Sequence, residues 1–212
     1  MFEDAEQTFR SFTREVAART APEAARLLLA LSDEQAEELF GNLDERALER
    51  LGEEEELLAR GKWHERRAKQ IEKQVARWTG EVEPSQREVI RRAALELQPA
   101  YSEWIASQRE WREALRKLRA NGREQREDEV RAQRELTSLL ISPEEFWTEE
   151  YRLKLAHNRE RTLELFVTLD QRLTAKQRAH LQRRFVRLAS ELEALAREPT
   201  RPARAHPSKS RG

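Results

Sequence analysis

Apolar residues recur along this chain every three or four positions, which is the spacing of one face of an α-helix. In the clearest case the intervals are four, three, four and three: Leu181, Phe185, Leu188, Leu192 and Leu195. Near the N-terminus a second helical face holds Phe2, Phe9, Phe12 and Val16. Alternating apolar and polar runs, the mark of a half-buried strand, are short throughout. The pattern predicts an all-α protein, an extended antiparallel bundle of about six to eight helices with no sheet.

Proline, glycine and capping residues predict where the first helices begin and end. Thr20 and Pro22 predict a new helix start, and Gly41-Asn42 predicts an interruption of the helix that follows. Residues 44–78 contain no proline, so we expect one long or twice-kinked helix there, closed by Thr79-Gly80.

The later boundaries follow from the same residue types. Pro84 fits the first turn of a helix, and Pro99 separates that helix from the next one. Asn121-Gly122 predicts a helix end. Ser142-Pro143 predicts a new start, and the last helix is expected to begin at Thr174.

The domain organisation follows from these elements. Residues 1–197 are expected to form a single helical domain, with a candidate sub-boundary near residues 79–83. Residues 198–212 are basic and proline-rich and hold no apolar pattern, so we predict a disordered tail.

Three segments share a signature in which a capping position is followed three residues later by glutamine. They are Ser32 with Gln35, Glu83 with Gln86, and Thr174 with Gln177. In a capping box the first side chain accepts from the backbone N–H of the glutamine, whose own side chain reaches back to the first backbone N–H. Losing such a cap costs about 1 kcal/mol. We therefore interpret these glutamines first as helix starts.

The segment from Leu173 to Gln177 has the form Leu-Thr-x-x-Gln, which resembles the signature of the small periplasmic helical chaperones of the Spy and CpxP type. A longer succession resembles a proteobacterial family of candidate lipoproteins, catalogued only as a domain of unknown function. That succession comprises the basic residues 66–69, Trp78-Thr79-Gly80, residues 104–111, Tyr151-Arg152, Asn158-Arg159, Thr162-Leu163 and the final helix. The resemblance covers roughly residues 9–197.

The resemblance implies a cell-envelope location, in the periplasm or at the inner face of the outer membrane. Members of the family begin with a signal sequence and a lipidated cysteine, which we expect upstream of Met1 if the resemblance holds. We then expect Phe2, Phe9 and Phe12 to pack on neighbouring helices or on a second copy of the chain, or else not to be well ordered. If Met1 is instead the true start, we expect a cytoplasmic protein.

Composition narrows the classes of partner. Lys and Arg (40) balance Asp and Glu (40), so the chain has no net charge that would attract nucleic acid, and only the basic tail offers that minor alternative. The absence of cysteine excludes disulfides and thiolate metal sites. No run approaches the roughly 18 apolar residues of a membrane span.

Two clusters of residues are candidates for binding. Trp104 and Trp111 lie seven residues apart on one helical face with Arg109 nearby, and such a face can grip peptides or sugars. The competing interpretation is a stripe buried in the core. Asn158 lies within a helical seam beside Arg159, where an amide fixes helix register or ties to another segment, with ligand binding as the alternative.

Signatures of catalysis or metal binding are lacking. A di-iron bundle needs Glu three residues before His, and the residues found there are Gly61, Lys154, Gln177 and Ala203. Phosphate-binding glycine loops and nucleophile motifs are also absent. We expect no enzyme activity, no cofactor and no metal.

The function expected from residues and resemblance together is a helical cell-envelope protein that binds polypeptides in a chaperone-like manner. It would expose an apolar or aromatic concave face to protein or peptide partners, a second copy of the chain among them. The first alternative is a purely structural envelope lipoprotein. The second alternative is nucleic-acid binding through the basic tail.

Overall fold

A computed structural model describes residues 2–124 and 129–197. These residues form eight α-helices and one short 3-10 turn, without a strand, so the all-α prediction is confirmed. The helices are α1 (Phe2–Ala30), α2 (Asp33–Ala59), α3 (Trp63–Thr79), α4 (Pro84–Glu96), α5 (Tyr101–Glu124), α6 (Glu129–Ile141), α7 (Glu149–Gln171) and α8 (Ala175–Arg197), with the 3-10 turn at Pro143–Phe146. The predicted tail 198–212 lies outside the described residues, as do the side chains of Phe2, Phe9 and Leu195.

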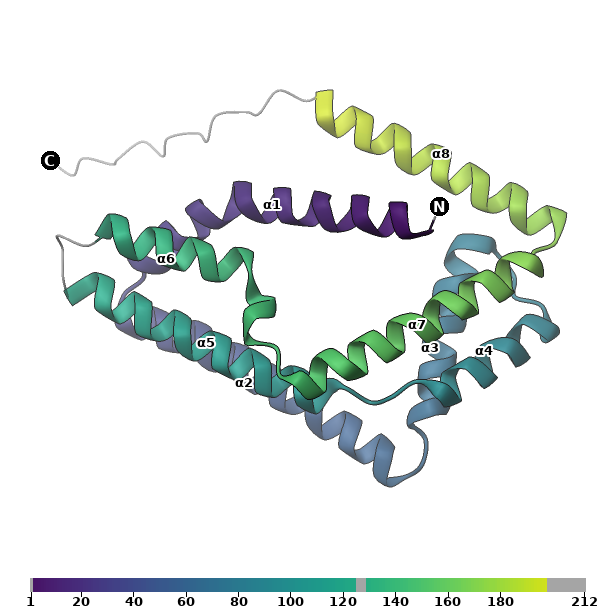
Figure 1. The fold of residues 1–212 in the computed structure, drawn as a ribbon, viewed down its shortest axis with the longest axis horizontal. Helices are drawn as coiled ribbons and strands as arrows, with labels where there is room; N and C mark the ends of the chain where they lie inside the picture. The colour runs from purple at the N-terminus through teal and green to yellow at the C-terminus, as the bar shows by residue number, and fades with distance from the viewer. Residues whose placement is uncertain (1, 125–128, 198–212) are drawn as a thin grey trace, which may run out of the picture.

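The helices gather into two groups (Figure 1). Helices α1, α2, α5 and α6 form what we call the closed region, in which α6 packs against both α1 and α5. Helices α3, α4, α7 and α8 form the groove region, in which α4 packs against α3 and α7. Residues 80–83, near the candidate sub-boundary, join α3 to α4 within the groove region. The chain passes between the two regions at residues 60–62, 97–100 and 147–148.

The closed region has a tightly packed core. Its buried side chains are Ala25, Leu28, Ala36, Phe40, Leu115 and Leu136. Gly122 of α5 lies so near α6 that an added Cβ would stand 2.5 Å from the Cβ of Ala132. The missing side chain at residue 122 is therefore what lets these two helices approach.

The groove region has a second core, formed by Ala68, Val75, Val82, Ile90, Ala94, Leu165 and Leu169. The helices of this region begin and end at residues that the sequence predicted. Gly80 ends α3 with a φ of 86°, a conformation that favours glycine, and Pro84 occupies the first turn of α4. The predictions for Thr79-Gly80, Pro84 and the last helix are thus confirmed.

Two predicted interruptions in the first half of the chain are wrong. Helix α1 continues through Pro22, and α2 continues through Gly41-Asn42. Proline inside a helix costs about 3 kcal/mol and glycine about 1 kcal/mol. Packing of α1 on α6, and burial of Phe40 in α2, outweigh these local costs.

Three further boundaries differ from the prediction. The segment expected to hold one long helix from residue 44 to 78 is divided between α2 and α3, where Gly61 adopts a φ of 64°. Helix α5 continues past Asn121-Gly122 to Glu124, because that glycine serves packing against α6. Ser142-Pro143 opens only a 3-10 turn, and α7 begins after Thr148, whose side chain accepts from the backbone N–H of Tyr151.

Candidate functional site

An apolar groove lies between α3, α7 and α8, with a cavity volume of about 920 Å³. Its apolar lining comes from all three helices: Ile71, Val75, Trp78, Leu165, Phe166, Leu169, Leu173, Leu181 and Phe185. Because the lining comes almost entirely from these three helices, the apolar side chains between them stay open on one side. The groove is therefore the candidate binding site.

The sequence places these side chains through two helical seams. On α3, Ile71, Val75 and Trp78 recur at four and three residues, and on α8 Leu181 and Phe185 continue the same spacing. The two seams face each other because α3 packs against α8. Of the α3 seam, Val75 is buried, whereas Ile71 and Trp78 are only half-buried at the groove wall.

Aromatic rings remain accessible in the groove. Trp78 and Phe185 stack across it with ring centroids 5.4 Å apart and an interplanar angle of 29°. Phe185 nevertheless stays 54% exposed, and Phe166 of α7 stays 45% exposed. Side chains of this size are normally buried, and large exposed apolar patches mark binding surfaces.

The charges around the groove are mainly positive. Arg67, Lys73 and Arg77 line it from α3, and the guanidinium of Arg184 lies 5.5 Å from the centre of the Trp78 ring. The one acidic residue of the lining, Asp170, forms an ion pair with Arg178 at 3.1 Å. A ligand with apolar and acidic groups would match this rim.

Two of the repeated glutamines meet beside the groove and hold α4 and α8 together. The Oε1 atoms of Gln86 and Gln177 accept from the backbone N–H groups of Glu83 and Thr174, both at 2.9 Å, as a capping box requires. Each Nε2 donates to the other Oε1 at 2.9 Å. The remaining N–H groups of Gln86 and Gln177 donate to the carbonyls of Arg172 at 2.9 Å and of Glu81 at 2.7 Å, respectively.

This arrangement satisfies every donor and acceptor of two buried carboxamides, since each has two N–H groups and two acceptor positions. Gln86 and Gln177 are 1% and 4% exposed. The shared signature therefore does more than start two helices. It fixes the N-terminus of α8, and with it one wall of the groove.

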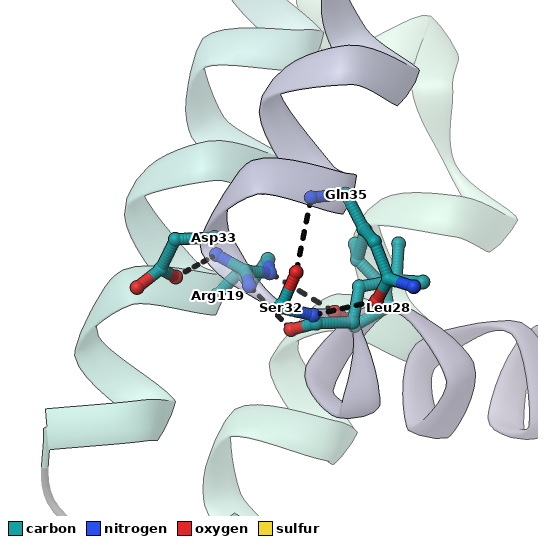
Figure 2. Close-up of polar contacts among 6 residues, drawn as sticks. Leu28, Ser32, Asp33, Gln35 and Arg119 are labelled. Atoms are coloured by element: carbon teal, nitrogen blue, oxygen red, sulfur yellow. Dashed lines mark hydrogen bonds and ion pairs between the residues drawn. The ribbon is translucent and has the colours of Figure 1, made fainter.

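The third glutamine, Gln35, makes the same capping box but stays at the surface. Its Oε1 accepts from the Ser32 N–H at 2.9 Å, and the Ser32 Oγ accepts from the Gln35 N–H at 3.1 Å (Figure 2). Gln35 is exposed and does not join the other two glutamines. Here a buried arginine, Arg119 of α5, makes the hydrogen bonds to the neighbouring helices instead.

Arg119 joins the end of α1 to the start of α2 (Figure 2). Its Nε donates to the carbonyl of Leu28 at 3.1 Å, one terminal nitrogen donates to the carbonyl of Leu31 at 2.6 Å, and the other pairs with Asp33 at 2.9 Å. Arg119 is only 6% exposed. The last carbonyls of a helix lack partners within it, and a cation there is favourable.

The tryptophans proposed from sequence lie on α5, away from the groove lining. Trp111 packs against the core of the closed region, and its indole N–H donates to the carbonyl of Leu139 at 2.8 Å. Trp104 stacks on Tyr101 with ring centroids 5.1 Å apart. Arg109 is exposed. The structure thus assigns Trp111 packing contacts and does not bring these three side chains into the groove.

Asn158 ties α7 to the linker between α4 and α5. Its Oδ1 accepts from the backbone N–H of Gln98 and its Nδ2 donates to the carbonyl of the same residue, both at 2.8 Å. The neighbouring His157 bonds the carbonyl of Glu96 at 2.8 Å, close to the end of α4. Arg159 is exposed. These contacts position the junction between the two regions.

Two ion pairs with perturbed pKa values lie outside the groove. Burial alone would raise the pKa of Asp44, but the hydrogen bond from Arg116 and the charges of Arg112 and Arg116 outweigh it and lower that pKa. Burial alone would also raise the pKa of Glu103. Its hydrogen bonds, the strongest from Lys154, outweigh burial and lower that pKa. Both pairs join separate helices and act as structural braces.

Two further kinds of feature are not found in the described residues. We find in them no group of three or more His, Asp or Glu side chains placed to hold a metal ion. In the same part of the chain no helix is both long and apolar enough to cross a lipid bilayer.

Sequence reasoning missed both Arg119 and the groove. Arg112 and Arg119 stand seven residues apart on the face of α5 that also carries the buried Leu115, and charged residues inside an apolar stripe were the available signal. The α8 seam was visible in the sequence as an apolar stripe, and the α3 residues recur at the same spacing. What the sequence did not show is that the space between them is left open.

Comparison with known proteins gives a family. No curated protein and no solved structure matches the chain. Residues 1–152 match the model of DUF6279, a family of unknown function. The matched residues hold α1 to α6 and the start of α7, whereas α8 follows them. Because the match spans well over half of the chain, this protein belongs to the DUF6279 family.

Proposed function

We propose that this chain is a non-enzymatic binding protein that takes apolar stretches of unfolded or partner polypeptides into the groove between α3, α7 and α8. The observation that carries the proposal is an open apolar groove of about 920 Å³ whose aromatic side chains Phe166 and Phe185 stay about half-exposed. Apolar area of this kind favours association with any chain that can cover it.

The groove suits polypeptides better than a small cofactor. It is an open trough along three helices, and its walls offer apolar contact with few polar groups that would fix one orientation. Its cations, Arg67, Lys73 and Arg77, lie on exposed parts of α3 and would attract acidic stretches of a client without selecting one sequence. Such a site binds many chains weakly, as a chaperone-like function requires.

The cell envelope is the proposed location. It is supported by the resemblance of residues 173–177 to the Spy and CpxP signature and by the succession of motifs shared with candidate lipoproteins. The genomic DNA immediately upstream of the Met1 codon tests this location. An in-frame signal sequence with a lipidated cysteine supports it, and an in-frame stop with a ribosome-binding site before Met1 contradicts it.

Suppression of aggregation of a denatured client tests the binding function. We expect the protein to delay light scattering at equimolar ratio, and we expect Phe166→Ser to remove most of that delay. Phe12→Ser is the matched control, since Phe12 is 57% exposed on a helix of the closed region. Loss of the delay in both variants would place binding elsewhere. No delay with the unmodified protein would contradict the function and leave a structural envelope protein.

A further inference from the structure

The acidic side chains of α3 are paired away from the groove. Glu65 and Glu72 line a second hollow, between α3 and α4. There Glu65 pairs with Lys69 at 2.6 Å, and Glu72 pairs with Arg87 of α4 at 2.7 Å. Neither acid lines the groove. Helix α3 therefore offers no carboxylate of its own to a ligand in the groove.

The groove side of the same helix is positive. Arg67, Lys73 and Arg77 line the groove, and the amide side chains between them, Gln70 and Gln74, are neutral. Among the described residues we find no carboxylate paired with any of these three cations, and Arg67 donates to Gln70 at 3.4 Å. In a chain with equal numbers of acidic and basic residues, this row of cations is available to an acidic ligand.

The other walls of the groove lack such a row. The charged side chain that lines it from α7 is Asp170, which pairs with Arg178 at 3.1 Å. The lining side chains of α8 are apolar, and Arg184 of α8 stands over the ring of Trp78, on the α3 side. The groove is thus apolar between its walls, positive along α3 and close to neutral along α7.

We propose that the groove takes an amphipathic helix of a partner polypeptide whose apolar stripe has acidic residues along one flank, with that flank against α3. The inference rests on the proposed function and adds to it the class of segment and its orientation. A helix laid in an apolar groove makes contact along its whole stripe. Its carboxylates would then lie opposite the cations of α3.

The spacing of the cations favours a polypeptide over a ligand with a single acidic group. Arg67 and Arg77 are ten residues apart, which is about 15 Å along a helix that rises 1.5 Å per residue. One carboxylate can approach only one end of such a row. Acidic residues at every third or fourth position of a bound helix form a row of similar length on one face.

Three synthetic peptides test the proposed class of segment. They share one helical stripe of leucines and differ along one flank, which carries Glu, Gln or Lys. Fluorescence anisotropy measures the binding of each labelled peptide to the full chain at low and at high salt. We expect the Glu peptide to bind about tenfold more tightly than the Gln peptide, because several exposed ion pairs form, and the Lys peptide to bind most weakly. High salt should remove most of the difference.

A charge reversal on α3 tests the orientation. The double variant K73E/R77E should prefer the Lys peptide to the Glu peptide. The matched control is R183E/R187E, which makes the same change of charge at exposed positions of α8 outside the groove lining and should keep the preference for the Glu peptide. Misfolding cannot produce an inverted preference, and thermal unfolding of each variant reports folding separately.

Each outcome decides the proposal. Equal binding of the Glu and Gln peptides overturns the acidic preference and leaves the proposed function standing, whereas a lack of binding by all three peptides contradicts both. An unchanged preference in K73E/R77E overturns the orientation. Laurate, an apolar chain with one carboxylate, should displace the Glu peptide poorly. If laurate binds as tightly as that peptide, the groove does not require a row of acidic groups and the proposal is wrong.

Discussion

The closed region and the groove region contain the same number of helices but are held together by different chemistry. In the closed region, buried arginines of α5 bind the neighbouring helices. Arg119 donates to carbonyls at the end of α1, and Arg112 lies 2.9 Å from the carboxylate of Asp44 within α2. In the groove region the corresponding brace is neutral, a pair of buried carboxamides from Gln86 and Gln177.

The difference suggests how the protein separates stability from binding. The closed region buries one core between its four helices, although Phe12 and Val16 of α1 stay exposed. It lies wholly within residues 1–152, the part matched by the family model. The groove region leaves a seam open, so its third wall, α8, has to be fixed at one end by hydrogen bonds. A rigid glutamine pair performs that task next to an exposed apolar surface.

The largest effect is expected in the closed region from Arg119→Ala. The change removes three hydrogen bonds of a buried guanidinium and leaves the carbonyls of Leu28 and Leu31 without this donor. We expect a loss of about 3–4 kcal/mol in the free energy of unfolding, measured by urea denaturation. Arg26→Ala is the control, because that side chain is 60% exposed and should lose less than about 0.5 kcal/mol. Similar losses in both variants would contradict the brace.

The next effect separates the two kinds of capping glutamine. Gln177→Ala leaves the Gln86 carboxamide buried with unsatisfied groups and should cost about 2–3 kcal/mol. Gln35→Ala removes an identical capping contact at the surface and should cost about 1 kcal/mol. Urea denaturation of both variants measures the difference. Equal losses would show that the glutamine pair adds nothing to its two caps.

A smaller effect is expected from Gly122→Ala. Alanine improves helix propensity by about 1 kcal/mol, but its Cβ would stand 2.5 Å from the Cβ of Ala132, so α5 and α6 must move apart. We expect a net loss of about 1–2 kcal/mol. Gly52→Ala, where the added Cβ meets nothing within 4 Å, should instead stabilise the protein. A stabilised Gly122→Ala variant would show that the two helices are not held in close contact.

The smallest effect depends on pH and belongs to the ion pair of the closed region. The pKa of Asp44 is lowered in the folded state below its ordinary value of 3.8, so the unfolded state takes up the proton first as the pH falls. The stability that Asp44 contributes is therefore complete above pH 3.8 and is lost as the pH falls below that value. We expect Asp44→Asn to cost less than about 1 kcal/mol at neutral pH. Denaturation curves of the two proteins should converge at lower pH, and a constant gap would contradict the lowered pKa.

Sequence reasoning located most helices because its signals are local. The capping boxes at Ser32 and Thr174, the glycine at residue 80 and the proline at residue 84 act within one turn of chain. It failed at Pro22 and Gly122, where contacts with a distant helix outweigh local preference. Helix propensity is a weak signal wherever packing decides.

The candidate site was visible only in its parts. The seam of α8 was evident, but nothing local shows that Gln86 and Gln177, 91 residues apart, share hydrogen bonds. Nor does periodicity show which face of an apolar stripe stays open. Trp111 and Trp78 occupy similar stripes, yet α6 covers the first and no helix covers the second completely.

Site-specific photo-crosslinking gives the most direct test of the binding groove. A benzophenone amino acid would replace Phe166 in the groove in one variant and Phe12 of the closed region in another, since both side chains are about half-exposed. After irradiation with a denatured client, we predict abundant crosslinks from position 166 and few from position 12. Equal crosslinking at both positions, or none at position 166, would contradict the assignment of the groove as the polypeptide-binding site.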